Sequence, residues 1–167
     1  GVTVTGGEPL LQTKFLVTLF KELKKRNIPT AIDTSGMFDI TDDIKELLKF
    51  TDLVLLDIKH IDSTKCKDLV GFSNEKELAF ARYLSDNNID IWIRQVLVPG
   101  ITDDGKDLLK LKEFISTLKT VKKIEINPYH ELGKFKWEEL GLKYPLEGVR
   151  PADSNDVDRA KKILGIK

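Results

Sequence analysis

Short apolar runs alternate with amphipathic stretches along the whole chain, and each kind of stretch predicts one kind of element. The apolar runs are rich in Val, Ile and Leu and have the length of β-strands. One of them, Leu53–Ile58, is almost continuously apolar, which is typical of a strand buried on both faces of a parallel sheet. We expect five strands, at Val2–Thr5, Thr30–Asp33, Leu53–Ile58, Ile89–Val98 and Lys123–Ile126.

The stretches between the expected strands carry apolar residues at helical spacing. They predict helices over Gln12–Arg26 and Glu75–Asp86, and three further helices with readable caps or apolar stripes. These have Ile44, Leu47 and Leu48 after a cap at Thr41 or Asp42; Leu108, Leu111, Ile115 and Leu118; and Val157, Ala160, Ile163 and Leu164 after a cap at Ser154.

The order of these elements predicts an α/β fold with a parallel sheet, because the connections between strands are long enough for crossovers. The sheet is either a barrel-like (β/α) array or a doubly wound sheet, since the eight repeats of a closed barrel are absent. No linker divides the chain, so we expect residues 1–167 to form one domain. The exception to the regular pattern is Tyr129–Pro151, whose three glycines and two prolines favour a functional loop or lid.

The composition narrows the classes of function. The 27 basic and 27 acidic residues balance, so no basic excess points to nucleic acid as a partner. No apolar run approaches the length that crosses a bilayer, so no membrane partner is expected. The single cysteine, Cys66, excludes an internal disulfide and fits a reducing compartment, so we expect a cytoplasmic protein. A β-branched run at the second residue suggests that the chain was cut from a longer protein.

Polar and ionisable residues gather where the expected strands end, which is where parallel α/β sheets bind ligands. Each residue also has an ordinary structural explanation, such as a tight turn, a helix cap, a local ion pair or a surface histidine. Their common position at one rim favours a functional site. The rim residues are Gly6, Gly7, Glu8 and Pro9; Asp33, Thr34, Ser35 and Gly36; Asp57, Ile58, Lys59 and His60; Arg94; and Asn127, Pro128, Tyr129 and His130.

Several of these segments resemble a known family. The Gly-Gly-Glu-Pro sequence at Gly6–Pro9, directly after a strand, resembles the second signature of radical S-adenosylmethionine (SAM) enzymes. Longer stretches resemble, in the same order and spacing, the family of pyruvate formate-lyase activating enzymes. These stretches are GVTVTGGEPLLQ, AIDTSG, TDLVLLDIK, LVGFSN, WIRQVLVPG and KIEINPYHELGKFKW. The resemblance covers essentially the whole chain.

The resemblance implies a partial (β/α) barrel of the radical SAM type, with about five parallel strands and outer helices. The first strand of the family's barrel would be missing here. The same missing N-terminal part would hold the CxxxCxxC loop, whose three cysteines bind a [4Fe–4S] cluster in the family. No such motif is present in the sequence and Cys66 stands in the wrong context, so we expect activity only from the intact parent protein.

The resemblance also implies SAM-binding roles for ten of the rim residues. Gly6, Gly7 and Glu8 would contact the methionine part of SAM, Asp33 and Thr34 would lie beside its carboxylate, Asp57, Ile58 and Lys59 would form the wall of its pocket, and Arg94 and His130 would approach it from the fourth and last strands. A monovalent cation could bind Asp33, Thr34 and Asp57 with the backbone carbonyl of Leu55. Gly133–Trp137 would lie near the docked loop of the partner.

The reaction that the resemblance implies is hydrogen-atom abstraction. The reduced cluster would pass one electron to SAM, and the 5′-deoxyadenosyl radical would take a hydrogen from a glycine Cα in the glycyl loop of pyruvate formate-lyase. A flavodoxin or ferredoxin would donate the electron, and no residue of this chain would be a conventional acid–base or nucleophilic catalyst. The alternatives are an activase of another glycyl radical enzyme, a cluster-less module that binds SAM or the partner, and an aldolase-like enzyme with Lys59 as a Schiff-base lysine.

Overall fold

The computed structural model describes residues 1–166 and confirms the α/β class. Its five strands form one sheet in which every neighbouring pair is parallel. All five expected strands are present, and the last is longer than predicted. The strands are β1 (Val2–Val4), β2 (Thr30–Thr34), β3 (Leu53–Asp57), β4 (Asp90–Leu97) and β5 (Val121–Pro128).

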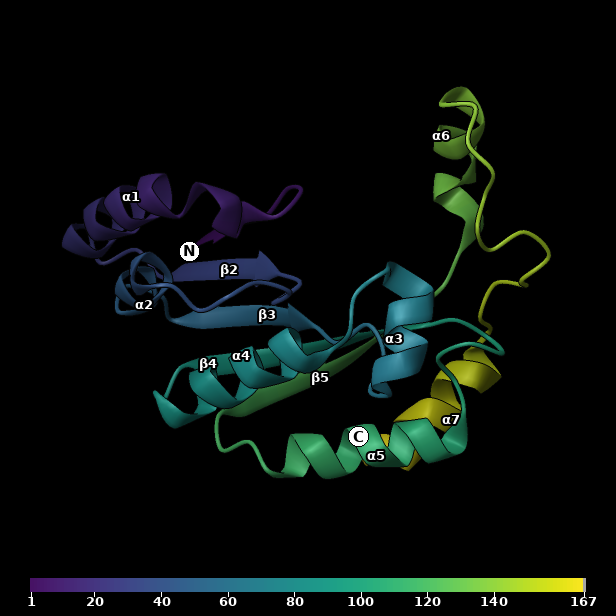
Figure 1. Ribbon diagram of the computed structural model, residues 1–167. Helices are drawn as coiled ribbons and strands as arrows, with labels where there is room; N and C mark the ends of the chain where they lie inside the picture. Colours follow the sequence, from purple (N-terminus) through teal and green to yellow (C-terminus); the bar gives the residue numbers. More distant parts are fainter. Residues whose placement is uncertain (167) are drawn as a thin grey trace.

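Helices lie in every connection between strands (Figure 1). The five expected helices are α1 (Thr13–Lys25), α2 (Asp42–Leu48), α4 (Glu75–Asp86), α5 (Gly105–Ser116) and α7 (Ser154–Leu164). Four short helices were not expected: η1 (Pro9–Gln12), α3 (Ser63–Val70), η2 (Glu131–Gly133) and α6 (Lys134–Glu139). Among residues 1–166, none of the helices combines the length and the apolar character needed to span a membrane.

The caps of two helices test the predicted helix starts. Thr41 caps α2, since its Oγ1 accepts from the backbone N–H of Ile44 at 3.3 Å. The expected cap at Ser154 is wrong, because Ser154 is the first residue of α7 and Asp153 caps the helix. The Asp153 carboxylate accepts from the N–H of Asp156, and the Asp156 carboxylate accepts from the N–H of Asp153, both at 3.0 Å. This reciprocal capping box satisfies two helix-start donors at once, which a single serine does not.

The strand order decides between the two sheet types that the sequence left open. The strands lie side by side in chain order, β1-β2-β3-β4-β5, without the reversal that defines a doubly wound sheet. Crossovers of one hand between successive neighbours place the helices on one face of a curved sheet. In Figure 1, α4 lies along β4, and α5 and α7 lie together beside β4 and β5. The doubly wound alternative is therefore wrong, and the fold is a barrel-like partial (β/α) array.

Burial alternates along the central strands, because helices cover only one face of the sheet. In β3, Val54 and Leu56 are fully buried, whereas Leu55 on the other face is half-buried. In β4, Ile93 is buried and Arg94 beside it is half-buried. The expectation that Leu53–Ile58 is buried on both faces is wrong. The uncovered face stays accessible as the inner surface of the open barrel, and it can carry polar groups.

The core lies between the sheet and the helices that cover it. Its largest fully buried side chains include Phe20 of α1, Leu47 of α2, Phe80 of α4 and Leu108 of α5. Burying a side chain of this size contributes about 2–3 kcal/mol. Phe15, which stands at helical spacing with the α1 core residues, is instead 61% exposed.

The segment Tyr129–Pro151 is more ordered than its glycines and prolines suggest. It contains η2 and α6, which project away from the body of the domain in Figure 1. The Tyr129 and Tyr144 hydroxyls are hydrogen-bonded at 2.7 Å, and Trp137 meets Tyr144 edge to face. Burial and this hydrogen bond raise the pKa of Tyr129. We call Tyr129–Pro151 the arm. The hydrogen bond between Tyr129 and Tyr144 joins the start of the arm to its returning part.

Candidate functional site at the carboxyl ends of the strands

The turn after β1 is built on two glycines. Gly6 has φ +138°, a conformation that residues with a Cβ rarely adopt. A Cβ added at Gly6 or at Gly7 would meet no protein atom within 4 Å, so packing does not demand either glycine. The backbone of this turn faces open space at the rim, and a ligand can approach it closely.

Glu8 follows the turn, and its carboxylate accepts four hydrogen bonds. Oε1 accepts from the N–H of Leu10 at 3.2 Å and from the hydroxyl of Thr34 at 2.7 Å. Oε2 accepts from the N–H of Ser35 at 3.1 Å and from its hydroxyl at 2.8 Å. A carboxylate offers about four lone-pair sites, so these donors engage Glu8 fully. They tie the turn after β1 to the end of β2.

The end of β2 is shaped by a second turn. The Thr34 hydroxyl accepts from the N–H of Gly36 at 3.2 Å, and the Ser35 hydroxyl accepts from the N–H of Met37 at 3.4 Å. Gly36 has φ +70°, and a Cβ there would lie 2.7 Å from Cδ1 of Leu56. Both conditions require glycine, because the conformation is left-handed and the space is filled. The turn places the two hydroxyls toward Glu8.

Arg94 joins three strands on the inner face of the sheet. Its Nε donates to Asp57 at 2.7 Å, and its Nη1 donates to Asp33 at 3.0 Å while Nη2 bonds the other oxygen of Asp33. Burial lowers the pKa of Arg94, but the hydrogen bonds and charges of Asp33 and Asp57 outweigh it and hold the pKa above its ordinary value. The result is a charge row of one cation and two anions across β2, β3 and β4.

Lys59 extends this row beyond the end of β3. Its Nζ donates to Asp57 at 2.8 Å. Ile58, which stands between Asp57 and Lys59 in the chain, is buried. Its N–H donates to the carbonyl of Arg94 at 2.9 Å, and this hydrogen bond holds the backbone at the end of β3 against β4. A lysine that forms an imine must react as an uncharged amine, whereas the ion pair with Asp57 favours the charged ammonium form of Lys59. The ion pair therefore disfavours the aldolase-like alternative.

Two acidic residues near the rim were missed in the sequence. Glu125 of β5 lies opposite Arg94 in the register, and a strand alignment could have found it. Glu77 in the first turn of α4 is fully buried, and its carboxyl oxygens have no hydrogen-bond partner among the described residues. Burial raises the pKa of Glu77 to about 8. No sequence signal marks it, since Glu-Lys-Glu at Glu75–Glu77 reads as an exposed helix start.

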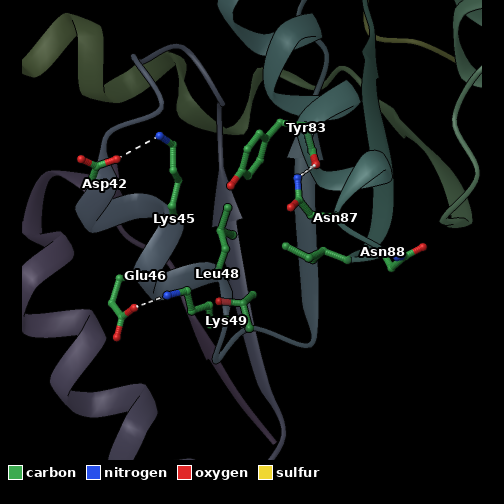
Figure 2. A pocket seen from close by; sticks show the side chains of 10 residues that line it. Asp42, Lys45, Glu46, Leu48, Lys49, Tyr83, Asn87 and Asn88 are labelled. Carbon is green, nitrogen blue, oxygen red and sulfur yellow. Dashed lines mark hydrogen bonds and ion pairs between the residues drawn. The ribbon is translucent and has the colours of Figure 1, made fainter.

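A separate hollow of about 710 Å³ lies near the amino ends of β3 and β4, between α2 and α4 (Figure 2). Its charged residues pair with neighbours three positions away in the chain: Lys45 with Asp42 at 2.9 Å and Lys49, which caps the end of α2, with Glu46 at 2.8 Å. None of the sequence-predicted site residues lines it. The hollow and the rim are therefore at opposite ends of the sheet.

Comparison with known proteins decides the family. A family model described as "Radical SAM superfamily" matches residues 1–112, which include the turn, the Glu8 contacts and the charge row. The chain belongs to the radical SAM superfamily. Radical SAM proteins use SAM together with a [4Fe–4S] cluster, so the expected cofactors are confirmed for the parent protein.

The curated relatives of this radical SAM chain share one name. It is 55% identical to the pyruvate formate-lyase-activating enzyme of Staphylococcus epidermidis and 50% identical to that of Streptococcus mutans. Each comparison covers 98% of this chain, but only 67% and 64% of the two relatives. The chain thus spans about two thirds of the length of the relatives it matches.

Solved structures confirm the radical SAM fold. A domain of the pyruvate-formate lyase-activating enzyme from Bacteroides vulgatus superimposes with a TM-score of 0.81 and 26% identity, covering 100% of this chain and 96% of that one. Streptococcus suis SuiB bound to S-adenosylmethionine gives 0.72 with 19% identity, covering 98% of this chain and 35% of SuiB. The second likeness supports the fold alone.

The described residues do not fit the iron–sulfur cluster of radical SAM proteins. Residues 1–166 contain no group of three or more His, Cys, Asp or Glu placed to hold a metal ion. Cys66 is fully buried, and burial raises its pKa to about 11, which disfavours the thiolate that binds iron. Residues 1–166 therefore do not supply the ligands of the cluster.

The SAM-binding roles of the ten rim residues and the monovalent-cation site all remain predictions, and the structure bears on two of them in particular. In the proposed cation site, the Arg94 guanidinium already bridges Asp33 and Asp57, and the Thr34 hydroxyl donates to Glu8. His130 is exposed beyond the end of β5, and its ring makes no hydrogen bond to any of residues 1–166. The structure thus brings Glu8, Asp33, Thr34, Asp57, Lys59 and Arg94 into connected clusters, but it leaves His130 outside them.

Proposed function

We propose that this chain is the SAM-binding part of an activase that generates the glycyl radical of pyruvate formate-lyase. The observation that carries the proposal is the row of Asp33, Arg94, Asp57 and Lys59 beside an open glycine turn, all at one end of a radical SAM sheet. The names of relatives that are 50–55% identical supply the substrate class.

The rim fits the methionine part of SAM, which carries both an ammonium and a carboxylate group. Lys59 is the cation that can meet the carboxylate, and the backbone carbonyls of Gly6 and Gly7 together with Asp33 can meet the ammonium. Bound SAM, with the cluster, supplies the chemistry that removes a hydrogen atom from a glycine Cα. The chain's own residues bind and orient the cofactor.

Arg94 has a holding role in this proposal. By bonding to both Asp33 and Asp57, it keeps two carboxylates at defined positions on the inner face. A guanidinium with a raised pKa stays charged throughout the physiological range, so the row does not change its charge with pH through Arg94. Preorganised charges of this kind need no rearrangement when the ligand binds.

We further propose that the arm Tyr129–Pro151 closes over the site and lies beside the glycyl loop of the partner. Its projection from the domain in Figure 1 and the exposure of Leu132, Phe135 and Leu140 support a contact role. Limited proteolysis tests the lid: SAM plus a glycyl-loop peptide should protect the arm from cleavage. Unchanged cleavage would count against closure. A flavodoxin or ferredoxin as the electron donor and a cytoplasmic location are further predictions.

The test of the proposed function uses the intact parent protein with its cluster reconstituted without oxygen. Mixing it with SAM, a reductant and pyruvate formate-lyase should produce the electron paramagnetic resonance signal of a glycyl radical on the lyase. An Arg94→Met variant with the same iron content should lose most of the signal. A cluster-loaded protein that activates only another glycyl radical enzyme would support that alternative, and a protein that binds SAM but activates none would support the binding-module alternative.

A further inference from the structure

The hydrogen bonds of Glu8 differ from what an ammonium-binding glutamate needs. A carboxylate that receives a ligand ammonium keeps acceptor sites free for it. Glu8 instead accepts from Leu10, Thr34 and twice from Ser35, which uses its four sites. Three of these four donors come from the end of β2, 26 or 27 residues along the chain.

The hydroxyls of Thr34 and Ser35 each accept one hydrogen bond and donate another. The Ser35 hydroxyl accepts from the N–H of Met37 and donates to Glu8, and the Thr34 hydroxyl accepts from the N–H of Gly36 and donates to Glu8. Chains of hydrogen bonds that end on a charge strengthen one another. The left-handed turn at Gly36 is thereby connected to the carboxylate of Glu8 by two parallel chains.

We propose that Ser35 is a positioning residue, which holds the Gly6–Gly7 turn in place by clamping Glu8. The clamp consists of Glu8, Thr34 and Ser35. In this protein the glutamate of the Gly-Gly-Glu-Pro sequence anchors the turn. Recognition of the SAM ammonium falls to the turn's backbone and to the one acceptor site of Asp33 that Arg94 and Thr5 leave free. The ligand part of this inference rests on the proposed function, whereas the clamp itself does not.

The clamp has a direct reporter in the N–H of Leu10, which donates to Glu8, and in the neighbouring N–H of Leu11, which donates to the carbonyl of Glu8 at 3.2 Å. Hydrogen exchange of these amides in the ligand-free parent protein measures how often the turn opens. A charge-assisted hydrogen bond is strong enough that its loss should speed opening about tenfold.

Four variants test the clamp. Ser35→Ala removes the hydroxyl donor, and Glu8→Gln leaves an amide that can serve only one pair of donors, so each should speed exchange at Leu10 and Leu11 about tenfold. The double variant should be no faster than either single one, because both remove the same interaction. Ser35→Thr, which keeps the hydroxyl, should restore slow exchange. Ser116→Ala is the matched control, since Ser116 is exposed at the end of α5 and its hydroxyl donates to the backbone carbonyl of Glu113.

Titration with SAM, followed by calorimetry on the cluster-loaded protein, separates an anchor from a direct ligand. Under the clamp, Ser35→Ala and Glu8→Gln weaken SAM binding by similar factors, and the double variant adds nothing. A Glu8→Gln loss far larger than the Ser35→Ala loss would overturn the proposal, and so would additive effects on exchange. If the variants showed the expected exchange rates but the protein activated no lyase, the proposed function would be wrong and the clamp would still stand.

Discussion

The two ends of the sheet both carry charged residues but hold them in different ways. At the carboxyl ends, Asp33, Asp57 and Arg94 come from three strands and are less than a quarter exposed. At the amino ends, the hollow in Figure 2 carries ion pairs three residues apart on one helix, such as Lys49 with Glu46. An isolated helix can form the second kind of pair, but only the folded sheet can form the first.

This difference separates a built site from a surface feature. The hollow is large, yet its charges neutralise one another locally and in exposed positions, where ion pairs contribute little. The rim has costly half-buried charges that cross-link strands and leave a glycine turn open to a ligand. Whether paired charges come from several strands or from neighbouring positions of one helix is therefore a better guide to function here than the volume of the hollow.

The largest expected effect concerns Glu77, beneath the rim end of α4. Its pKa is about 8 in the folded state against an ordinary value of 4.5, so the folded state binds the proton more tightly. The stability that this group contributes is fully present below about pH 4.5 and is lost as the pH rises to about 8, in total on the order of 5 kcal/mol. Glu77→Gln should remove this slope and raise the free energy of unfolding at pH 8.

Urea unfolding at a series of pH values measures the Glu77 effect. Glu75→Gln is the matched control, because Glu75 starts the same helix but is exposed. It should leave the pH profile of stability unchanged. If Glu77→Gln and the wild type had parallel profiles between pH 5 and 8, roughly the range set by the two pKa values, the buried neutral carboxyl would be refuted.

The next effect is that of Arg94→Met. It leaves Asp33 and Asp57 half-buried without their shared cation, which should lower the free energy of unfolding by about 2 kcal/mol. Denaturant midpoints with an unchanged slope would measure it. Stability equal to the wild type would mean that the three-strand charge row holds little of the rim together.

Gly36→Ala should act locally at the rim. The methyl group meets Cδ1 of Leu56 at 2.7 Å and the φ of +70° is unfavourable for alanine, so we expect a loss of about 1–2 kcal/mol. Gly71→Ala provides the comparison, because it has φ +85° but no atom within 4 Å of the new Cβ. Equal losses in the two variants would show that the packing against Leu56 contributes nothing.

The smallest effect is expected at the hollow. Lys49→Met removes an exposed pair with Glu46, whose second partner Lys21 remains at 2.8 Å. The free energy of unfolding should not change measurably, because exposed pairs of this kind are screened by water and salt. A loss as large as that of Arg94→Met would erase the distinction between the two ends of the sheet.

Much of this architecture could be predicted from the sequence, because local patterns dictate it. The strand positions follow from apolar runs, and the cap at Thr41 follows from its position before an apolar stripe. The rim followed from the rule that ligands meet the carboxyl ends of parallel strands. The features that escaped depend on tertiary packing: the open inner face beside Leu55, the burial of Glu77 and the clamp made by Ser35.

Each of these misses has a physical cause. The composition of Leu53–Ile58 cannot show whether helices cover one face or two, because that depends on strand order. Glu77 stands among charged neighbours in the sequence but faces Gly36 and the end of β3 in the fold. Ser35 was recognised as a rim residue, but its role depends on a carboxylate 27 residues away.

The most direct test of the central claim is a map of SAM-induced protection on the cluster-loaded parent protein, by hydrogen exchange with and without SAM. We predict slower exchange at the amides of residues 6–8, 33–36 and 57–59, with no change at residues 45–49 and 83–88 around the hollow. Protection at the hollow, or tight SAM binding that leaves the rim amides unchanged, would contradict the assignment of the cofactor site to the carboxyl ends of the strands.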